Sequence, residues 1–382
     1  MAKSPRSIFE EVATADKQKA APGAIDRASG AGARHLVRRW LMVIFTLVAL
    51  MIAVGGMTRL TDSGLSITEW APISGMVPPI GAAAWQEQFD AYKLTTEFQV
   101  QNASMTLAEF KSIFWWEWGH RQLGRVIGLV WALGFAYFTL RGQMPTGWTQ
   151  KTFLVGVLIG VQGAIGWWMV ASGLKEGMLD VASYRLAVHL GLAFVILGLI
   201  AWYVLLLGRR EADLLQARRN GERRLFGMST GLMHFAFLQI VLGALVAGID
   251  AGRAFPTWPL MGDGFFPPDP FSISPVWRNF FEDAGLVQFV HRMAAYLLFV
   301  YAIVVWSRAR KSPHTATRFA FNAVLAMMFI QVVLGIFTAL YSAPVHIAIV
   351  HQIGAVLLWV LIFRARYLAR YPLKQIIAGA GQ

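Results

Sequence analysis

The sequence predicts an all-α integral membrane protein with eight transmembrane helices, arranged as two pseudo-symmetric four-helix bundles. Three observations support this fold class. Hydrophobic residues make up 56% of the 382 residues and charged residues only 14%, which is little charge for a soluble chain of this length. Eight apolar runs are each close to the ~20 residues needed to cross the hydrocarbon core of a bilayer. The two halves of the chain also repeat one pattern of histidines.

The apolar runs define the expected spans and the domain boundaries. The expected spans are 40–58, 122–140, 153–171, 186–207, 228–248, 286–306, 319–340 and 344–364. They divide into an N-terminal bundle (40–207) and a C-terminal bundle (228–366), which a basic cytoplasmic linker (208–227) joins. Polar cytoplasmic tails (1–39 and 367–382) are expected to flank the two bundles.

Basic residues gather in every second loop. Of the 34 Lys and Arg residues, 24 lie in the two tails and in the loops after spans two, four and six. By the positive-inside rule, both termini of this multi-pass chain are therefore cytoplasmic. Because these residues stand between apolar spans, the net charge of +13 indicates topology and does not indicate nucleic-acid binding.

Short motifs recur in corresponding spans of the two halves. The matched segments are 120–121 with 291–292, 162–166 with 331–335, and 187–191 with 349–354. Each half also has a long outer loop after its first span. This pattern predicts an internal duplication, in which two bundles of one orientation are related by an axis along the membrane normal.

Four histidines stand at matched places near the heads of spans two, four, six and eight. They are His120, His189, His291 and His351. Histidine within a membrane is costly and usually faces the protein interior or a cofactor. Two matched pairs predict two bis-histidine sites, for which heme is the best-fitting cofactor, and interhelical hydrogen bonding is the alternative. Because the four spans run in one direction, we expect both sites side by side, toward the periplasm.

The two halves differ three residues before the His-Arg pair. Glu117 precedes His120 in the first half, whereas Gln288 precedes His291 in the second. A spacing of three residues places Glu117 and His120 on one helix face. A carboxylate beside a hydrophobic site is a candidate base, nucleophile or cation stabiliser. The alternative is an interfacial glutamate that is solvated or paired with a nearby arginine.

These features resemble the heme A synthase family. The resemblance rests on the Glu-x-x-His-Arg motif at 117–121, the His-Arg pair at 291–292, the aromatic block 114–121 and the segment 55–66 after span one. It covers the chain from about residue 40 to about residue 366. The sequence has no cysteine, so it is similar to the cysteine-free branch shared by proteobacteria and mitochondria.

The resemblance implies an oxidoreductase of the bacterial inner membrane that converts heme O to heme A for terminal cytochrome oxidase. A ring methyl becomes a formyl group through successive hydroxylations, with water as the oxygen source. His291 and His351 would hold a permanent heme b, while His120 and His189 would bind the substrate heme and Glu117 would be catalytic. Heme O synthase is the implied donor of substrate. The electron acceptor is unidentified, and a homo-oligomer is an open possibility.

The propionates of a bound heme need cations or hydrogen-bond donors. Candidates at the outer level are Arg59, Arg121, Arg125, Arg253 and Arg292, for which contact with lipid headgroups is the alternative.

Two further outer features are expected near the sites. His346 aligns with Tyr184 and is interpreted as a pocket or gating residue. The aromatic outer loop 78–118 is expected to form an interfacial helix pair over the substrate half, with a plain aromatic belt as the alternative.

Two functions from other classes compete with the enzyme. One is a carrier or exporter that binds heme without chemistry. The other is a diheme b-type cytochrome in quinone-linked electron transfer. A carrier has no need of a carboxylate in one half only, and a transmembrane electron path would place hemes near both faces of the membrane.

Overall fold

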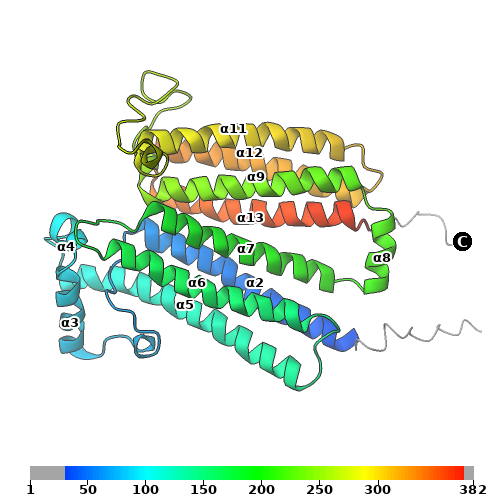
Figure 1. Cartoon of the computed structure of the whole chain (residues 1–382), viewed down its shortest axis with the longest axis horizontal. Coiled ribbons are helices and arrows are strands. Elements are labelled where there is room, and N and C mark those ends of the chain that lie inside the picture. The colour runs from blue at the N-terminus through cyan, green and yellow to red at the C-terminus, as the bar shows by residue number, and fades with distance from the viewer. Residues whose placement is uncertain (1–30, 374–382) are drawn as a thin grey trace, which may run out of the picture.

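The computed structural model describes residues 31–373, and within that range eight helices are long and apolar enough to cross a membrane (Figure 1). They are α2 (Ala31–Leu60), α5 (Leu107–Leu140), α6 (Thr149–Gly173), α7 (Ser183–Leu207), α9 (Arg223–Gly248), α11 (Ala284–Ala309), α12 (Thr315–Leu340) and α13 (Val345–Arg370). This confirms the all-helical membrane fold with eight spans. The pseudo-symmetry of the two halves stays a prediction.

The expected start of span two at residue 122 is wrong, because α5 begins at Leu107. Thr106 caps this helix: its hydroxyl accepts from the backbone N–H of Glu109, whose carboxylate accepts from the backbone N–H of Thr106. This reciprocal capping box starts the helix well before the hydropathy rises. At ~1.5 Å per residue the 34-residue helix is about 51 Å long, so it exceeds a bilayer core of ~30 Å. Glu117 and His120 therefore lie within a continuous helix and not at its head.

Short helices occupy the connections. The outer loop 78–118 contains two short helices, α3 (Gly81–Lys93) and α4 (Thr96–Gln101), but its residues 107–118 belong to α5; the interfacial position of the pair stays a prediction. The basic linker contains α8 (Glu211–Arg219), and a short α10 (Asn279–Glu282) precedes α11.

The two predicted tails are shorter than expected. Residues 31–39 of the first form the start of α2, and α13 continues to Arg370. The rest of each tail, residues 1–30 and 374–382, lies outside the described residues.

The spanning helices contact one another in two closed rings. In the first ring the order is α2, α5, α6 and α7, and in the second it is α9, α11, α12 and α13, with the last helix of each touching its first. The rings meet where α7 packs on α9 and α13, and where α2 packs on α13. The Trp359 indole donates to the carbonyl of Phe194 across this boundary at 2.9 Å. Buried polar bonds of this kind fix the position of one bundle against the other.

The long connections lie at one end of the molecule. Helices α3 and α4 and the loop between α9 and α10 lie at that end, while α8 lies at the opposite end (Figure 1). The four helices that carry the matched histidines, α5, α7, α11 and α13, all run away from the end with the long connections. All four histidines therefore lie toward that end.

Candidate functional site

Each matched histidine packs against a glycine of a neighbouring helix. The pairs, with the distance from an added Cβ to the ring atom Cε1, are Gly55–His120 (2.9 Å), Gly166–His189 (2.9 Å), Gly243–His291 (3.1 Å) and Gly335–His351 (3.3 Å). In both bundles these contacts join the first helix to the second and the third to the fourth. A side chain at any of these glycines would crowd an imidazole, so the glycines leave the room that the rings use.

Glutamine side chains hold two of the four rings. Gln162 Nε2 lies 3.2 Å from Nδ1 of His189 and donates to the carbonyl of the same histidine at 3.0 Å. Gln239 makes the same two contacts with His291, at 3.0 and 3.1 Å. Sequence reasoning missed both contacts. The matched residue of Gln162 is Gln331, yet its Nε2 is buried with no hydrogen-bond partner in the described part of the chain.

Each matched histidine interacts with the second matched histidine of its own bundle. His120 and His189 interact electrostatically within the first bundle, and His291 and His351 do so within the second. The Nδ1 atoms of His120 and His351 are buried with no hydrogen-bond partner among residues 31–373. Buried polar atoms are normally paired, and two imidazoles from opposite helices of a four-helix bundle are a ligand set that suits heme iron. The residues present therefore fit a heme in each bundle.

Glu117 is buried beside the first histidine pair, with 3% of its surface exposed. One carboxylate oxygen accepts from the Ser66 hydroxyl at 2.7 Å and from the backbone N–H of Ile67 at 2.8 Å. The other accepts from Arg121, at 2.6 Å from Nη2 and 3.1 Å from Nε. The arginine pairing that we considered as an alternative is thus present, but the solvated interfacial glutamate is wrong. Charge-assisted bonds of this number fix the carboxylate in one position.

Arg121 and Arg125 also hold the segment that follows α2. Arg121 donates to the carbonyls of Ile67 and Glu69 at 2.9 and 3.1 Å. Arg125 donates to the carbonyls of residues 71 and 72, each at 3.0 Å. These two propionate candidates therefore position the strip of chain whose Ser66 and Ile67 bind Glu117.

The second bundle has a neutral counterpart of this arrangement. Gln288 is buried, and its Nε2 lies 3.3 Å from the carbonyl of Phe255, while its Oε1 has no partner within the described residues. The buried Arg292 donates to the carbonyls of Phe255 and Leu260, at 2.8 and 3.3 Å. The arginine again ties a connecting loop to the helix, but the carboxylate is replaced by an amide.

The remaining propionate candidates lie in an ionic cluster. Arg59 donates to Asp62 at 2.7 Å and to Asp250 at 2.9 Å, and its Nη2 lies 3.5 Å from Asp180. Arg253 lies 3.9 Å from Asp250 with a half-exposed side chain. Arg59 thus interacts with carboxylates from connecting loops of both bundles. Arg253 is the more open of these two cations.

Two other histidines lie apart from the pairs. His346 is exposed in the first turn of α13, at the end of the molecule where the paired histidines lie. His234 is exposed on α9, and its Nδ1 donates to the carbonyl of Thr230 at 2.9 Å. His234 is therefore a hydrogen-bonding histidine of its own helix.

The aromatic residues of the outer loop form a small core. Trp85, Phe89, Tyr92, Phe110 and Phe114 are buried against one another where α3 packs on the first turns of α5. Two tryptophans of the same segment, at positions 115 and 116, are instead exposed. This packing supports a roof over the first bundle, with part of the aromatic set left facing outward.

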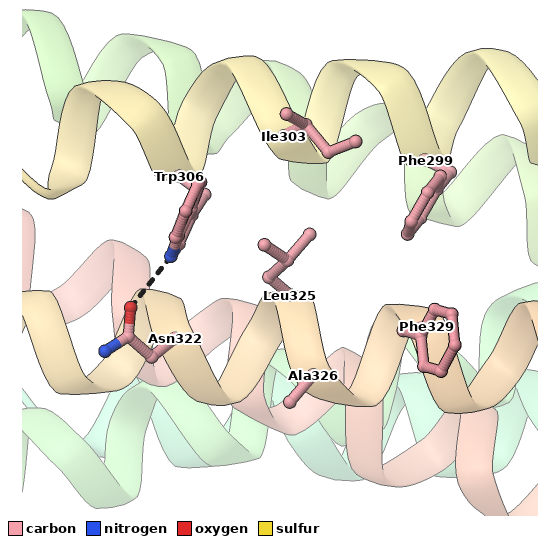
Figure 2. A pocket seen from close by; sticks show the side chains of 7 residues that line it. All are labelled: Phe299, Ile303, Trp306, Asn322, Leu325, Ala326 and Phe329. Atoms are coloured by element: carbon pink, nitrogen blue, oxygen red, sulfur yellow. Dashed lines mark hydrogen bonds between the residues drawn. The ribbon is translucent and has the colours of Figure 1, made fainter.

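A groove on the second bundle lies apart from these sites. It runs between α11 and α12, has a volume of about 630 Å³ and contains none of the paired histidines (Figure 2). Its polar contact is the bond from the Trp306 indole to Asn322, at 2.8 Å. Its walls, which Phe299, Leu325 and Phe329 help to form, are apolar. The groove therefore offers no group for acid–base or ligand chemistry.

Comparison with known proteins identifies the family. The family model described as "Cytochrome oxidase assembly protein" (COX15-CtaA) matches residues 38–363. The heme A synthase of Ruegeria sp. (strain TM1040) is 63% identical, over 98% of this chain and 100% of its own length. Those of Roseobacter denitrificans and Paracoccus denitrificans are 60% and 57% identical, over 98% of this chain and 99% and 98% of their own lengths. The chain therefore belongs to the COX15-CtaA family of cytochrome oxidase assembly proteins.

Proposed function

We propose that this chain is a heme A synthase, which oxidises a ring methyl of heme O to a formyl group and so provides heme A for cytochrome oxidase. The observation that carries the proposal is a difference between the two halves. In the first half the buried Glu117 carboxylate accepts four hydrogen bonds near His120, whereas in the second half the amide of Gln288 occupies the corresponding position near His291. The 63% identity with a curated heme A synthase over nearly the full chain supports the same reaction.

The two histidine pairs take different roles in this proposal. His120 and His189 bind heme O, because the only carboxylate built into either pair's surroundings lies in their half of the described chain. His291 and His351 hold a resident heme b, which supplies a one-electron acceptor when it is bound. Arg121, Arg125, Arg253 and Arg292 remain propionate candidates, and His346 remains a pocket candidate.

Glu117 acts on the substrate by its charge. Its bonds from Ser66, Ile67 and Arg121 hold the carboxylate in a fixed orientation before the substrate arrives. A fixed anion stabilises positive charge that develops on the methyl carbon, and it pays no reorganisation cost at that moment. The roof of α3, α4 and the first turns of α5 lies at the outer end of the same half.

The two competing functions make a different prediction for pigments. Purified protein that contains heme O and heme A beside heme B, with hydroxylated heme as a minor species, supports the enzyme. Heme B alone, unchanged by Glu117→Ala, favours a carrier or a diheme cytochrome. The position of all four histidines toward one end of the bundles also disfavours a path for electrons across the membrane.

We further propose that the end with the long connections faces the periplasm and that both termini are cytoplasmic. Reporter fusions after Asp263 and after Arg219, which are exposed at opposite ends of the molecule, should report periplasm and cytoplasm respectively. The reverse result would place every site on the cytoplasmic side. Heme O synthase, as the donor of substrate, would then have to deliver heme O to the opposite face.

The packing of His291 on Gly243 gives a direct test of the resident site. Gly243→Val should crowd the ring and reduce the bound heme b by about twofold or more, since overpacking in a fitted interior is destabilising. The measurement is the reduced-minus-oxidised spectrum per mole of purified protein. Gly227→Val on the same helix is the matched control, because an added Cβ there meets nothing within 4 Å. Equal heme content in the two variants would contradict the assignment.

A further inference from the structure

Glu97 is a buried carboxylic acid that the proposed chemistry does not yet use. It lies in α4 of the roof with 3% of its surface exposed, and its Oε2 has no hydrogen-bond partner in the described part of the chain. Tyr92 forms a side-chain hydrogen bond with Glu97, and the Tyr92 hydroxyl accepts from Asn102 at 2.8 Å. A carboxyl oxygen that is buried without a partner is costly, and such groups are common where protons move.

The ionised neighbours of Glu97 come from three other segments. Electrostatic interactions join it to Asp62 after α2, to Asp180 before α7 and to Glu117 in α5. Asp62 and Asp180 have side chains that are 48% and 40% exposed, whereas Glu117 is buried. The backbone N–H of Gly177 donates to the Thr96 hydroxyl at 3.1 Å, which holds α4 beside the loop that carries Asp180. Glu97 is thus a buried acid that interacts with one other buried acid and with two acids that reach water.

The three aspartates, by contrast, form an ion-paired cluster and carry no site of their own. Asp62, Asp180 and Asp250 place oxygen atoms within 4.8 Å of one another, a spacing that would suit a metal ion. However, the Arg59 guanidinium already bonds Asp62 and Asp250 and lies 3.5 Å from Asp180. The cluster therefore already contains a cation, the Arg59 guanidinium, and its carboxylates are partly exposed at the surface.

We propose that Glu97 is a proton-relay residue that carries protons from the substrate half to Asp180 and Asp62 at the outer surface. The inference rests on the proposed function, because the oxidation of a methyl carbon to a formyl carbon removes hydrogen, so protons must leave the roofed site. In each transfer the free Oε2 of Glu97 accepts one proton and then gives it to an exposed aspartate, from which it passes to water. Glu97 contacts neither substrate nor cofactor in this role.

The acidity of Glu97 suits this role. Burial is the main reason that the pKa of Glu97 is raised to about 8; the Tyr92 hydroxyl opposes this rise, and the negative charges of Asp180, Asp62 and Glu117 contribute to it. A group that titrates near neutral pH can both accept and release a proton under working conditions. As the pH rises toward 9, a larger fraction of Glu97 is able to accept a proton, so heme A formation should become faster.

The test compares Glu97→Gln with Glu87→Gln, which removes an exposed carboxylate from the same roof. Both proteins are purified with bound heme, and the rate of heme O oxidation is measured from pH 6 to pH 9. Glu97→Gln should lower the rate by about tenfold and remove its rise near pH 8, while the heme spectrum stays unchanged. Glu97→Asp, which keeps a carboxylate, should restore part of the rate and of the pH dependence.

A structural role would give a different result. A Glu97→Gln rate and pH profile equal to those of Glu87→Gln would overturn the relay, as would a variant that loses bound heme or accumulates poorly. Failure of the relay differs from failure of the proposed function: in the first case the wild-type protein still forms heme A, and in the second it forms none.

Protein stability gives an independent check on the acid itself. Because the folded pKa is raised above the usual 4.5, the wild-type protein should lose stability as the pH rises from about 5 to 8, and Glu97→Gln should lack this loss.

Discussion

Glu117→Gln should abolish heme A formation while both hemes remain bound. The substitution keeps the size and shape of the side chain and removes its charge, so the developing positive charge on the methyl carbon loses its fixed anion. Removal of one preorganised electrostatic group of this kind typically costs about a hundredfold to a thousandfold in rate. The amide is tolerated sterically, because Gln288 already occupies the corresponding place beside His291.

The measurement is the heme content of a strain that lacks its own synthase and expresses the variant. Heme O should accumulate, heme A should be absent, and the purified variant should keep the wild-type b-type spectrum. Glu109→Gln on the same helix is the matched control, since glutamine also completes a capping box and the site is untouched. Heme A at wild-type levels in Glu117→Gln would place the catalytic group elsewhere.

The bonds around Glu117 also limit what the substitution perturbs. Glutamine can still accept from the Ser66 hydroxyl or the N–H of Ile67, but its amide N–H₂ would face the Arg121 guanidinium or one of these donors. The variant therefore leaves one donor poorly paired, a cost of about 1–3 kcal/mol in stability. A modest loss of thermal stability beside a complete loss of heme A is the expected combination.

The fold follows from the sequence to the extent that hydropathy determines it. All eight spans were predicted, because each contains a continuous run of apolar side chains that can lie in lipid. The start of α5 at Leu107 was not predicted. The capping box of Thr106 and Glu109 sets this start, and hydropathy does not detect such local hydrogen bonds. The first turns of α5 pack against α3 in the roof, beyond the apolar run that hydropathy detects.

The chemistry-bearing residues of the site were named from the sequence, but their partners were not. The expected pairing of His120 with His189 comes from the repeat of the two halves, and the i,i+3 position of Glu117 relative to His120 follows from helical periodicity. Ser66 and Ile67 reach Glu117 only because the chain after α2 folds back along α5, and Gln239 reaches His291 from another helix. Contacts between segments distant in sequence depend on how the chain folds in three dimensions, and periodicity within one segment carries no information about them.

The acidic partners of Arg59 illustrate the same limit. Asp62 could be anticipated three residues away, but Asp180 and Asp250 come from the loops after α6 and α9. From the sequence, Arg59 is a candidate propionate ligand because it lies at the outer level. In the structure its guanidinium instead forms ion pairs with carboxylates. A guanidinium engaged by two strong ion pairs is less available to a further anion than a half-exposed one such as Arg253.

His291→Ala or His351→Ala should remove the resident heme b. Each substitution deletes one of the two proposed imidazole ligands, which α11 and α13 carry, and a single remaining imidazole would not keep the iron low-spin. His291 also loses its two contacts with Gln239, so an orphaned amide adds to the cavity left by the ring. The reduced-minus-oxidised spectrum of each purified variant should therefore lose most of its low-spin b-type signal.

His120→Ala and His234→Ala distinguish this assignment from a general loss of structure. His120→Ala should keep the b-type signal and lose heme A formation, because it affects the substrate pair in the first bundle. His234→Ala should change neither, because this exposed histidine bonds the Thr230 carbonyl of its own helix. If both second-bundle variants kept a full-strength low-spin signal while His120→Ala lost it, the resident heme would lie in the first bundle, and the roles of the two halves would be exchanged.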